Sequence, residues 1–172
     1  WAGWGRLQNL SPDFLRSVMT AAEAKAVESA EVQDLERSRR PGRGSTKRKR
    51  AALRAVGGPK YRGSSTVATA VLAYLEDDEA EIREASLRVL SHLIPSLDEM
   101  PRFDTTPFVE GAVGGIADSA SVVRQAAIET LTIWSPLEAK FVNQLQDMVR
   151  RHTRRIKASA LRALAAAESP AA

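Results

Sequence analysis

Four nine-residue segments of the chain share one pattern. They are "RKRAALRAV" (48–56), "IREASLRVL" (82–90), "VRQAAIETL" (123–131) and "IKASALRAL" (156–164). Each has an apolar residue, a basic residue, any residue, two small residues, Leu or Ile, any two residues, and Leu or Val; only Arg48 departs from this at the first place. The segments follow one another at offsets of 34, 41 and 33 residues. Repeats of this length, each holding a helical pair, are typical of an α-solenoid.

The pattern makes sense as helix packing. Positions one, five and nine, such as Ile82, Ser86 and Leu90, lie on one face of a helix, and Leu87 widens the apolar stripe. The small residues let a neighbouring helix approach closely. One pair cannot bury both of its faces, so the pairs must stack.

A partner helix is predicted before each repeated segment. We expect first helices over 11–36, 65–76, 106–117 and 136–150, and second helices over 46–57, 79–94, 120–134 and 153–168. Three starts are marked by a hydroxyl residue followed by proline, at Ser11, Thr106 and Ser135. Convincing strand patterns with a period of two are absent from the sequence.

The predicted fold is therefore all-α, a right-handed α-solenoid of about four antiparallel helix pairs. A short N-terminal arm, 1–10, stands outside the repeats. The pairs are expected over residues 11–57, 64–94, 105–134 and 136–168, with a tail at 169–172.

Two of the repeats resemble a known family. "LEDDEAEIREASLRVLSHL" and "IADSASVVRQAAIETL" are similar to HEAT repeats, which run as a helix, an Asp-containing turn and a Val-Arg-x-Ala-Ala helix. The resemblance covers about residues 46–168 and is best in the middle two repeats. It places Asp78 with Arg83, and Asp118 with Arg124, at the family's turn-Asp and helix-Arg positions, and implies that these residues join successive turns. The fourth repeat has "RRHTRR" where the turn Asp is expected.

Composition argues against most kinds of chemistry. The absence of Cys excludes disulfides, thiolate zinc sites and Cys nucleophiles. His92 and His152 lie in different repeats, and neither has a second ligand at metal-binding helix spacing. We therefore predict no catalytic, cofactor-binding or metal-binding residues, and no enzyme activity. The apolar runs are too short to span a bilayer. The chain begins with Trp1, so we expect a processed or truncated N-terminus; an organelle is consistent with this, and no compartment is assigned.

The charge is concentrated in one place. Residues 36–62 carry eleven basic side chains and one acidic one, whereas the other 145 residues carry fourteen basic and twenty acidic side chains. At the centre is "RRPGRGSTKRKR" (39–50), and a second basic turn spans 150–157. If the turns within pairs share one edge of the solenoid, that edge runs basic, acidic, near-neutral and basic.

The basic residues have several interpretations. The stretch 39–50 is a solvated loop, a nuclear-import signal, or a grip for phosphate or for an acidic protein surface. An import signal is disfavoured because "KRKR" begins a predicted packed helix. The predicted partner- or phosphate-binding residues are Arg39, Arg40, Arg43, Lys47, Arg48, Lys49, Arg50, Arg150, Arg151, Arg154 and Arg155.

The aromatic residues divide into two groups. Trp134, Tyr74, Phe108 and Phe141 fall at helical positions and are predicted to be core. Trp1 and Trp4 lie outside any repeat; they either cap the first pair or form a partner-docking arm, and we favour the arm.

The main functional hypothesis is a non-catalytic scaffold or adaptor subunit that mediates protein–protein contacts in a larger assembly. The alternative is an RNA-phosphate-binding accessory subunit of a ribonucleoprotein, using the loop 39–50 and the turn 150–157. A pigment lyase is allowed by the resemblance, but no nucleophile or acid–base pair supports it.

Overall fold

The computed structural model describes residues 30–38, 46–94 and 104–168. Within this part every regular element is a helix. In chain order there is a helical segment at 30–38, then α2 (Thr46–Val56), η2 (Pro59–Tyr61), α3 (Ser65–Leu72), η3 (Ala73–Glu76), α4 (Ala80–Leu93), α5 (Thr106–Gly115), α6 (Ser121–Ile133), α7 (Ala139–Arg151) and α8 (Arg154–Glu168). The arm 1–10, the tail 169–172 and most of the predicted helix 11–36 lie outside the described residues.

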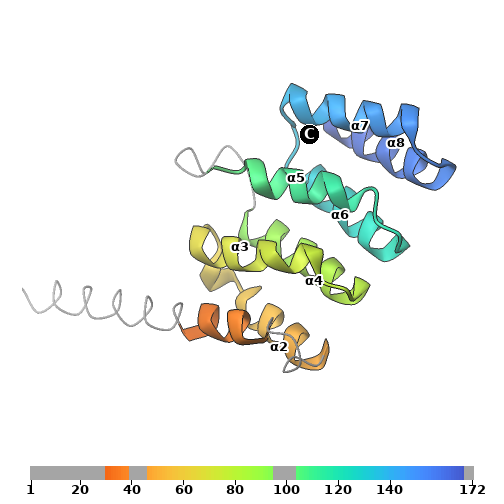
Figure 1. Ribbon diagram of the computed structural model, residues 1–172. Helices are drawn as coiled ribbons and strands as arrows, with labels where there is room; N and C mark the ends of the chain where they lie inside the picture. The colour runs from red at the N-terminus through yellow and green to blue at the C-terminus, as the bar shows by residue number, and fades with distance from the viewer. Residues whose placement is uncertain (1–29, 39–45, 95–103, 169–172) are drawn as a thin grey trace, which may run out of the picture.

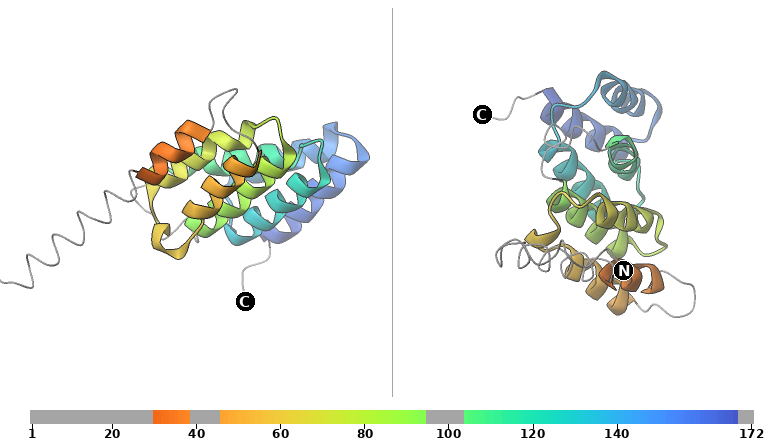
Figure 2. Two further views of the ribbon diagram at one scale, coloured as in Figure 1. Left: turned by 90° about the horizontal axis from the view of Figure 1, so that it is seen from below. Right: turned by 90° about the vertical axis from the view of Figure 1, so that its left-hand side faces the viewer.

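The helices pack as stacked pairs, as the repeats predicted (Figure 1). The second helices form one layer, in which α2 contacts α4, α4 contacts α6 and α6 contacts α8. The first helices α3, α5 and α7 form the other layer (Figure 2). The all-helical, paired architecture is thus confirmed.

The small residues of the repeat lie where the layers meet. Position five of the pattern is buried in all four segments, at Ala52, Ser86, Ala127 and Ala160. The one hydroxyl among them, on Ser86, donates to the carbonyl of Ile82 at 2.7 Å, so it leaves no unpaired polar group in the core.

Two glycines of α5 allow close helix approach. A Cβ atom on Gly111 would lie 2.5 Å from Cδ1 of Leu75, and one on Gly115 would lie 3.0 Å from Cβ of Ala127. A Cβ on the neighbouring Gly114 would meet open space. Close helix approach therefore requires glycine at Gly111 and Gly115 but not at Gly114.

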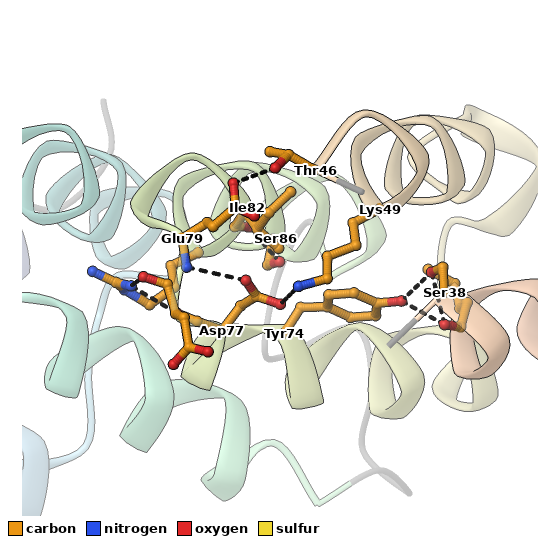
Figure 3. A network of polar contacts seen from close by, with 11 residues as sticks. Ser38, Thr46, Lys49, Tyr74, Asp77, Glu79, Ile82 and Ser86 are labelled. Carbon is orange, nitrogen blue, oxygen red and sulfur yellow. Dashed lines mark hydrogen bonds and ion pairs between the residues drawn. The ribbon is translucent and has the colours of Figure 1, made fainter. Parts of the chain in front are cut away.

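The predicted core aromatics are buried, and two of them make polar contacts between elements. The indole N–H of Trp134 donates to the carbonyl of Ile94 at 2.6 Å. The hydroxyl of Tyr74 donates to the carbonyl of Leu35 and is 2.6 Å from the hydroxyl of Ser38 (Figure 3). The two contacts of Tyr74 tie the helical segment 30–38 to η3.

One predicted helix start is wrong. Ser135-Pro136 does not open the fourth pair, because α7 begins three residues later, at Ala139, with Glu138 as its N-cap residue. The hydroxyl of Ser135 instead donates to the carbonyl of Ala166 in α8 at 3.0 Å. Among the described helices, none combines the length and the apolar character needed to cross a membrane.

Candidate partner-binding edge

The turns between the two helices of a pair lie along one edge of the stack. In Figure 1 the turns that lead into α4, α6 and α8 are all on the right-hand side. On this edge, a basic residue at position two of one repeat meets the acidic turn of the next pair. We call each such cross-pair contact a rung.

The first rung joins α2 to the turn before α4. The ammonium of Lys49 is 2.7 Å from a carboxylate oxygen of Asp77, and both side chains are largely buried. The other oxygen of Asp77 accepts the backbone N–H of Glu79 at 3.1 Å, which orients the carboxylate (Figure 3). The hydroxyl of Thr46 donates to the carboxylate of Glu79. The hydrogen bond to Asp77 raises the pKa of Lys49 despite its burial.

The second rung joins α4 to the turn before α6. Arg83 uses Nε and Nη2 to hold both carboxylate oxygens of Asp118, at 2.7 and 2.9 Å. Its Nη1 donates to the carbonyls of Asp77 and Asp78 in its own turn, at 2.6 and 3.0 Å. Burial opposes the charge on Asp118, but hydrogen bonds from Arg83 and from the N–H of Ala120 hold the pKa of that carboxyl below its usual range. The bond to Asp118 also raises the pKa of Arg83.

This geometry corrects the register expected from the sequence. Asp77, and not Asp78, is the counterpart of Asp118, because each accepts the N–H two residues ahead and each stands six residues before its helix Arg. Asp78 contributes only its backbone carbonyl. The rungs also run between pairs, so the partner of Arg83 is Asp118.

The third rung is missing. Arg124 repeats the local contacts of Arg83, since its Nη1 donates to the carbonyls of Asp118 and Ser119, both at 2.8 Å. However, its Nε and Nη2 donate to no residue in the described part of the chain. Arg151 stands six residues before Lys157, the position-two residue of α8, where the second and third repeats have Asp.

The residues of the basic stretch are placed as follows. Arg39, Arg40 and Arg43 lie outside the described residues. In α2, Lys47 is exposed, Arg48 is 3.3 Å from Asp34, and Arg50 is 3.0 Å from Glu81. Together with Lys49, these contacts use acidic groups of the same chain. From the sequence, the basic stretch and the acidic run 76–81 were interpreted as separate surfaces. Lys49 and Arg83 share position two of the repeat, and this was the signal that the two surfaces contact each other.

The second basic cluster lies at the last turn. Arg150, Arg151, Arg154 and Arg155 are exposed at the end of α7 and the start of α8. The only ion pair among them within the described residues is a loose one, 3.7 Å between Arg150 and Asp147. Trp1 and Trp4, the predicted docking arm, lie outside the described residues.

A groove of about 550 Å³ crosses the second-helix layer between α4, α6 and α8. It is lined by Glu81, Glu84, Arg88, Ser121, Val122, Arg124, Gln125, Ile128, Ser159 and Arg162.

No cluster of three or more His, Asp or Glu side chains suited to a metal ion occurs among the described residues.

Position six of the repeat is apolar in all four segments, and its last member, Leu161, is exposed. Leu53 and Leu87 are 1% exposed and Ile128 is 9% exposed, whereas Leu161 in α8 is 53% exposed. Leu87 is covered by the pair that follows it, whose Gly115 lies against its side chain and whose Thr130 donates to its carbonyl, and no described residue covers Leu161 in this way.

Comparison with known families agrees with the repeat geometry. Residues 59–90 and 101–131 match the family described as HEAT repeat associated with sister chromatid cohesion. These two segments are HEAT repeats. The matched HEAT segments contain α3 with most of α4 and α5 with most of α6, and so include the second rung from Arg83 to Asp118. The α7–α8 pair, whose turn lacks an acidic residue, lies outside the match. No curated protein matches this HEAT-repeat chain.

Proposed function

We propose that this HEAT-repeat chain is a non-catalytic scaffold subunit that mediates protein–protein contacts within a larger assembly. The observation that carries the proposal is the exposure of Leu161 at a position that is buried in the other three repeats. An apolar stacking position that no described residue covers is a candidate docking surface for further helices.

The chain itself indicates what kind of surface fits there. Over Leu87, the next pair supplies a glycine backbone, because a Cβ on Gly115 would lie 3.4 Å from Cδ1 of Leu87. The same pair supplies Thr130, whose hydroxyl donates to the carbonyl of Leu87 at 3.3 Å. A helix pair with a small residue at the crossing therefore fits over Leu161, and we assign this role to helices of a partner protein.

The internal ion pairs favour this function over RNA binding. Lys49 and Arg50 are held by the acidic turn of the next pair, and Arg48 by Asp34. Phosphates would have to compete with these carboxylates. The description of the matched family, which concerns sister chromatid cohesion, supports a multisubunit protein complex as the setting.

The proposal assigns no catalytic group. The two most buried ion pairs among the described residues, Lys49 with Asp77 and Arg83 with Asp118, are used in pairing adjacent repeats. They are therefore structural.

A photo-crosslinking amino acid at Leu161 tests the proposal in cells of the source organism. Gln144, exposed on α7 of the same pair, is the matched control position. The protein captured at Leu161 but not at Gln144 is then purified, and its affinity for the purified chain is measured. We expect Leu161→Asp to weaken binding at least about tenfold, as for a buried interface anchor, and Gln144→Asp to leave it unchanged.

Two results would contradict the scaffold function. One is equal binding by the Leu161→Asp and Gln144→Asp variants. The other is tight binding of random-sequence RNA with a steep salt dependence that is lost when residues 47–50 are changed to Gln, because phosphate contacts release counterions. The second result would establish the ribonucleoprotein function instead.

A further inference from the structure

We propose that the guanidinium of Arg124 binds an Asp or Glu side chain from an acidic segment of the partner protein, in the groove between α4, α6 and α8. The inference rests on the proposed scaffold function for the existence of a protein partner. It adds the chemistry of that partner and a second point of contact, distinct from Leu161.

The chain contains a filled version of the same site. Arg83 and Arg124 occupy equivalent repeat positions, and each anchors Nη1 on two carbonyls of its own turn. In Arg83 this anchoring directs Nε and Nη2 at a carboxylate, that of Asp118, in a bidentate contact. Arg124 has the same anchoring without the carboxylate. Its side chain is thus already fixed, and binding an acid there costs little rotamer entropy.

Among the described residues, none supplies Arg124 with a substitute carboxylate. Arg151 stands at the repeat position where Asp77 and Asp118 supply the carboxylate, and no acidic residue occurs in the sequence between Asp147 and Glu168. The nearby basic residues Arg150, Arg154 and Arg155 add positive potential to this edge, which attracts an anionic segment.

The groove favours an acidic peptide over a nucleic acid. Arg124 and Arg162 line it without a carboxylate partner among the described residues, whereas Arg88 is held by Glu84 and Glu129. Glu81 and Glu84 also line the groove and repel phosphates and carboxylates alike, so we confine the contact with the partner's acid to Arg124. The exposed Val122, which lines the same groove, offers an apolar contact to a peptide side chain.

The probe for the test is a fluorescein-labelled peptide, Ala-Asp-Glu repeated four times, with affinity measured by anisotropy. The ¹⁵Nε–H signal of Arg124 is followed in parallel by NMR, with that of Arg83 as internal reference. Arg124→Lys keeps the charge but removes the bidentate fork. We expect it to weaken binding about tenfold, the worth of a charge-assisted bidentate contact.

A second pair of variants separates the site from general charge attraction. Arg151→Asp puts an acid at the vacant rung position, and Arg150→Asp makes the same change in charge one residue away. We expect Arg151→Asp to weaken peptide binding at least about fivefold more than Arg150→Asp, because a neighbouring carboxylate competes for Arg124. Thermal melts confirm that each variant is folded.

Three results would overturn the inference. They are wild-type affinity in Arg124→Lys, equal losses in Arg150→Asp and Arg151→Asp, and displacement of the peptide by random-sequence RNA whose own affinity depends on Arg124. The last would assign the site to phosphate. Failure here is distinguishable from failure of the scaffold function, because the partner's dependence on Leu161 is measured without Arg124 variants and the peptide assay without Leu161 variants.

Discussion

Arg83 of α4 holds both carboxylate oxygens of Asp118, at 2.7 and 2.9 Å, across the boundary between two helix pairs. The same guanidinium donates to the two carbonyls of its own turn, so one side chain fixes a turn and joins two repeats. The two side chains are 16% and 12% exposed, so solvent screens this contact little.

Loss of this rung should cost more than loss of a surface pair. We expect Arg83→Gln to lower the free energy of unfolding by about 2 kcal/mol, because it leaves the Asp118 carboxylate desolvated with a weaker donor. Arg50→Gln breaks a pair whose side chains are 52% and 65% exposed and should cost less than about 1 kcal/mol. Urea denaturation measures both, and equal losses would show that the rung contributes no more than the surface pair.

The rung should also depend on pH. Its hydrogen bonds hold the pKa of Asp118 below the value of an unfolded chain, about 3.9. A depressed pKa contributes stability that is present above pH 4 and is lost as the pH falls through the folded-state pKa. We therefore expect the difference in Tm between wild type and Asp118→Asn to be largest near neutrality and to shrink below pH 4. A difference that stays constant down to pH 2.5 would contradict the depressed pKa.

Leu87 and Leu161 allow a comparison within one molecule. They share position six of the repeat but are 1% and 53% exposed. Leu87→Ala should lower the free energy of unfolding of the isolated chain by about 2–4 kcal/mol, since it opens a cavity. Leu161→Ala should change it by less than about 0.5 kcal/mol. A large loss from Leu161→Ala in the isolated chain would mean that Leu161 is already covered.

Gly114 and Gly115 provide a second matched pair. Gly115→Ala brings a Cβ to 3.0 Å from Cβ of Ala127, a short side chain that can yield only with its helix. We expect a loss of about 1 kcal/mol in stability. Gly114→Ala meets open space and should stabilise the chain by about 0.5 kcal/mol, because alanine restricts the unfolded state. Thermal melts with opposite shifts would confirm the assignment; shifts of the same sign would contradict it.

The repeat pattern predicted the packing well because apolar and small residues recur at fixed positions. The second helices begin and end within a few residues of the predicted ranges, and Leu87 and Ala127 lie where their register places them. The start of α7 was not predictable, since the role of Ser135 depends on Ala166, thirty-one residues away.

The candidate site was predicted less completely. The run "EDDEAE" offers several carboxylates in succession, and only the fold shows that Asp77 is the one that faces Lys49. The basic residues 47–50 were predicted to bind a partner or phosphate, and local sequence could not reveal that Arg48, Lys49 and Arg50 pair with acids of the same chain. That Arg124 lacks the carboxylate contact of its repeat position can be recognised only by comparing it with Arg83.

The rungs also give the stack a direction, like the polarity of a filament. Each runs from a cation in one pair to a carboxylate in the next, so a body that extends the stack beyond α8 must bring an acid to Lys157. A second copy of the chain, added head to tail, would bring its residues 39–45, which include three arginines and no acid. Heterologous contacts that do not close produce fibres. The same charges that hold adjacent repeats together therefore oppose runaway self-assembly.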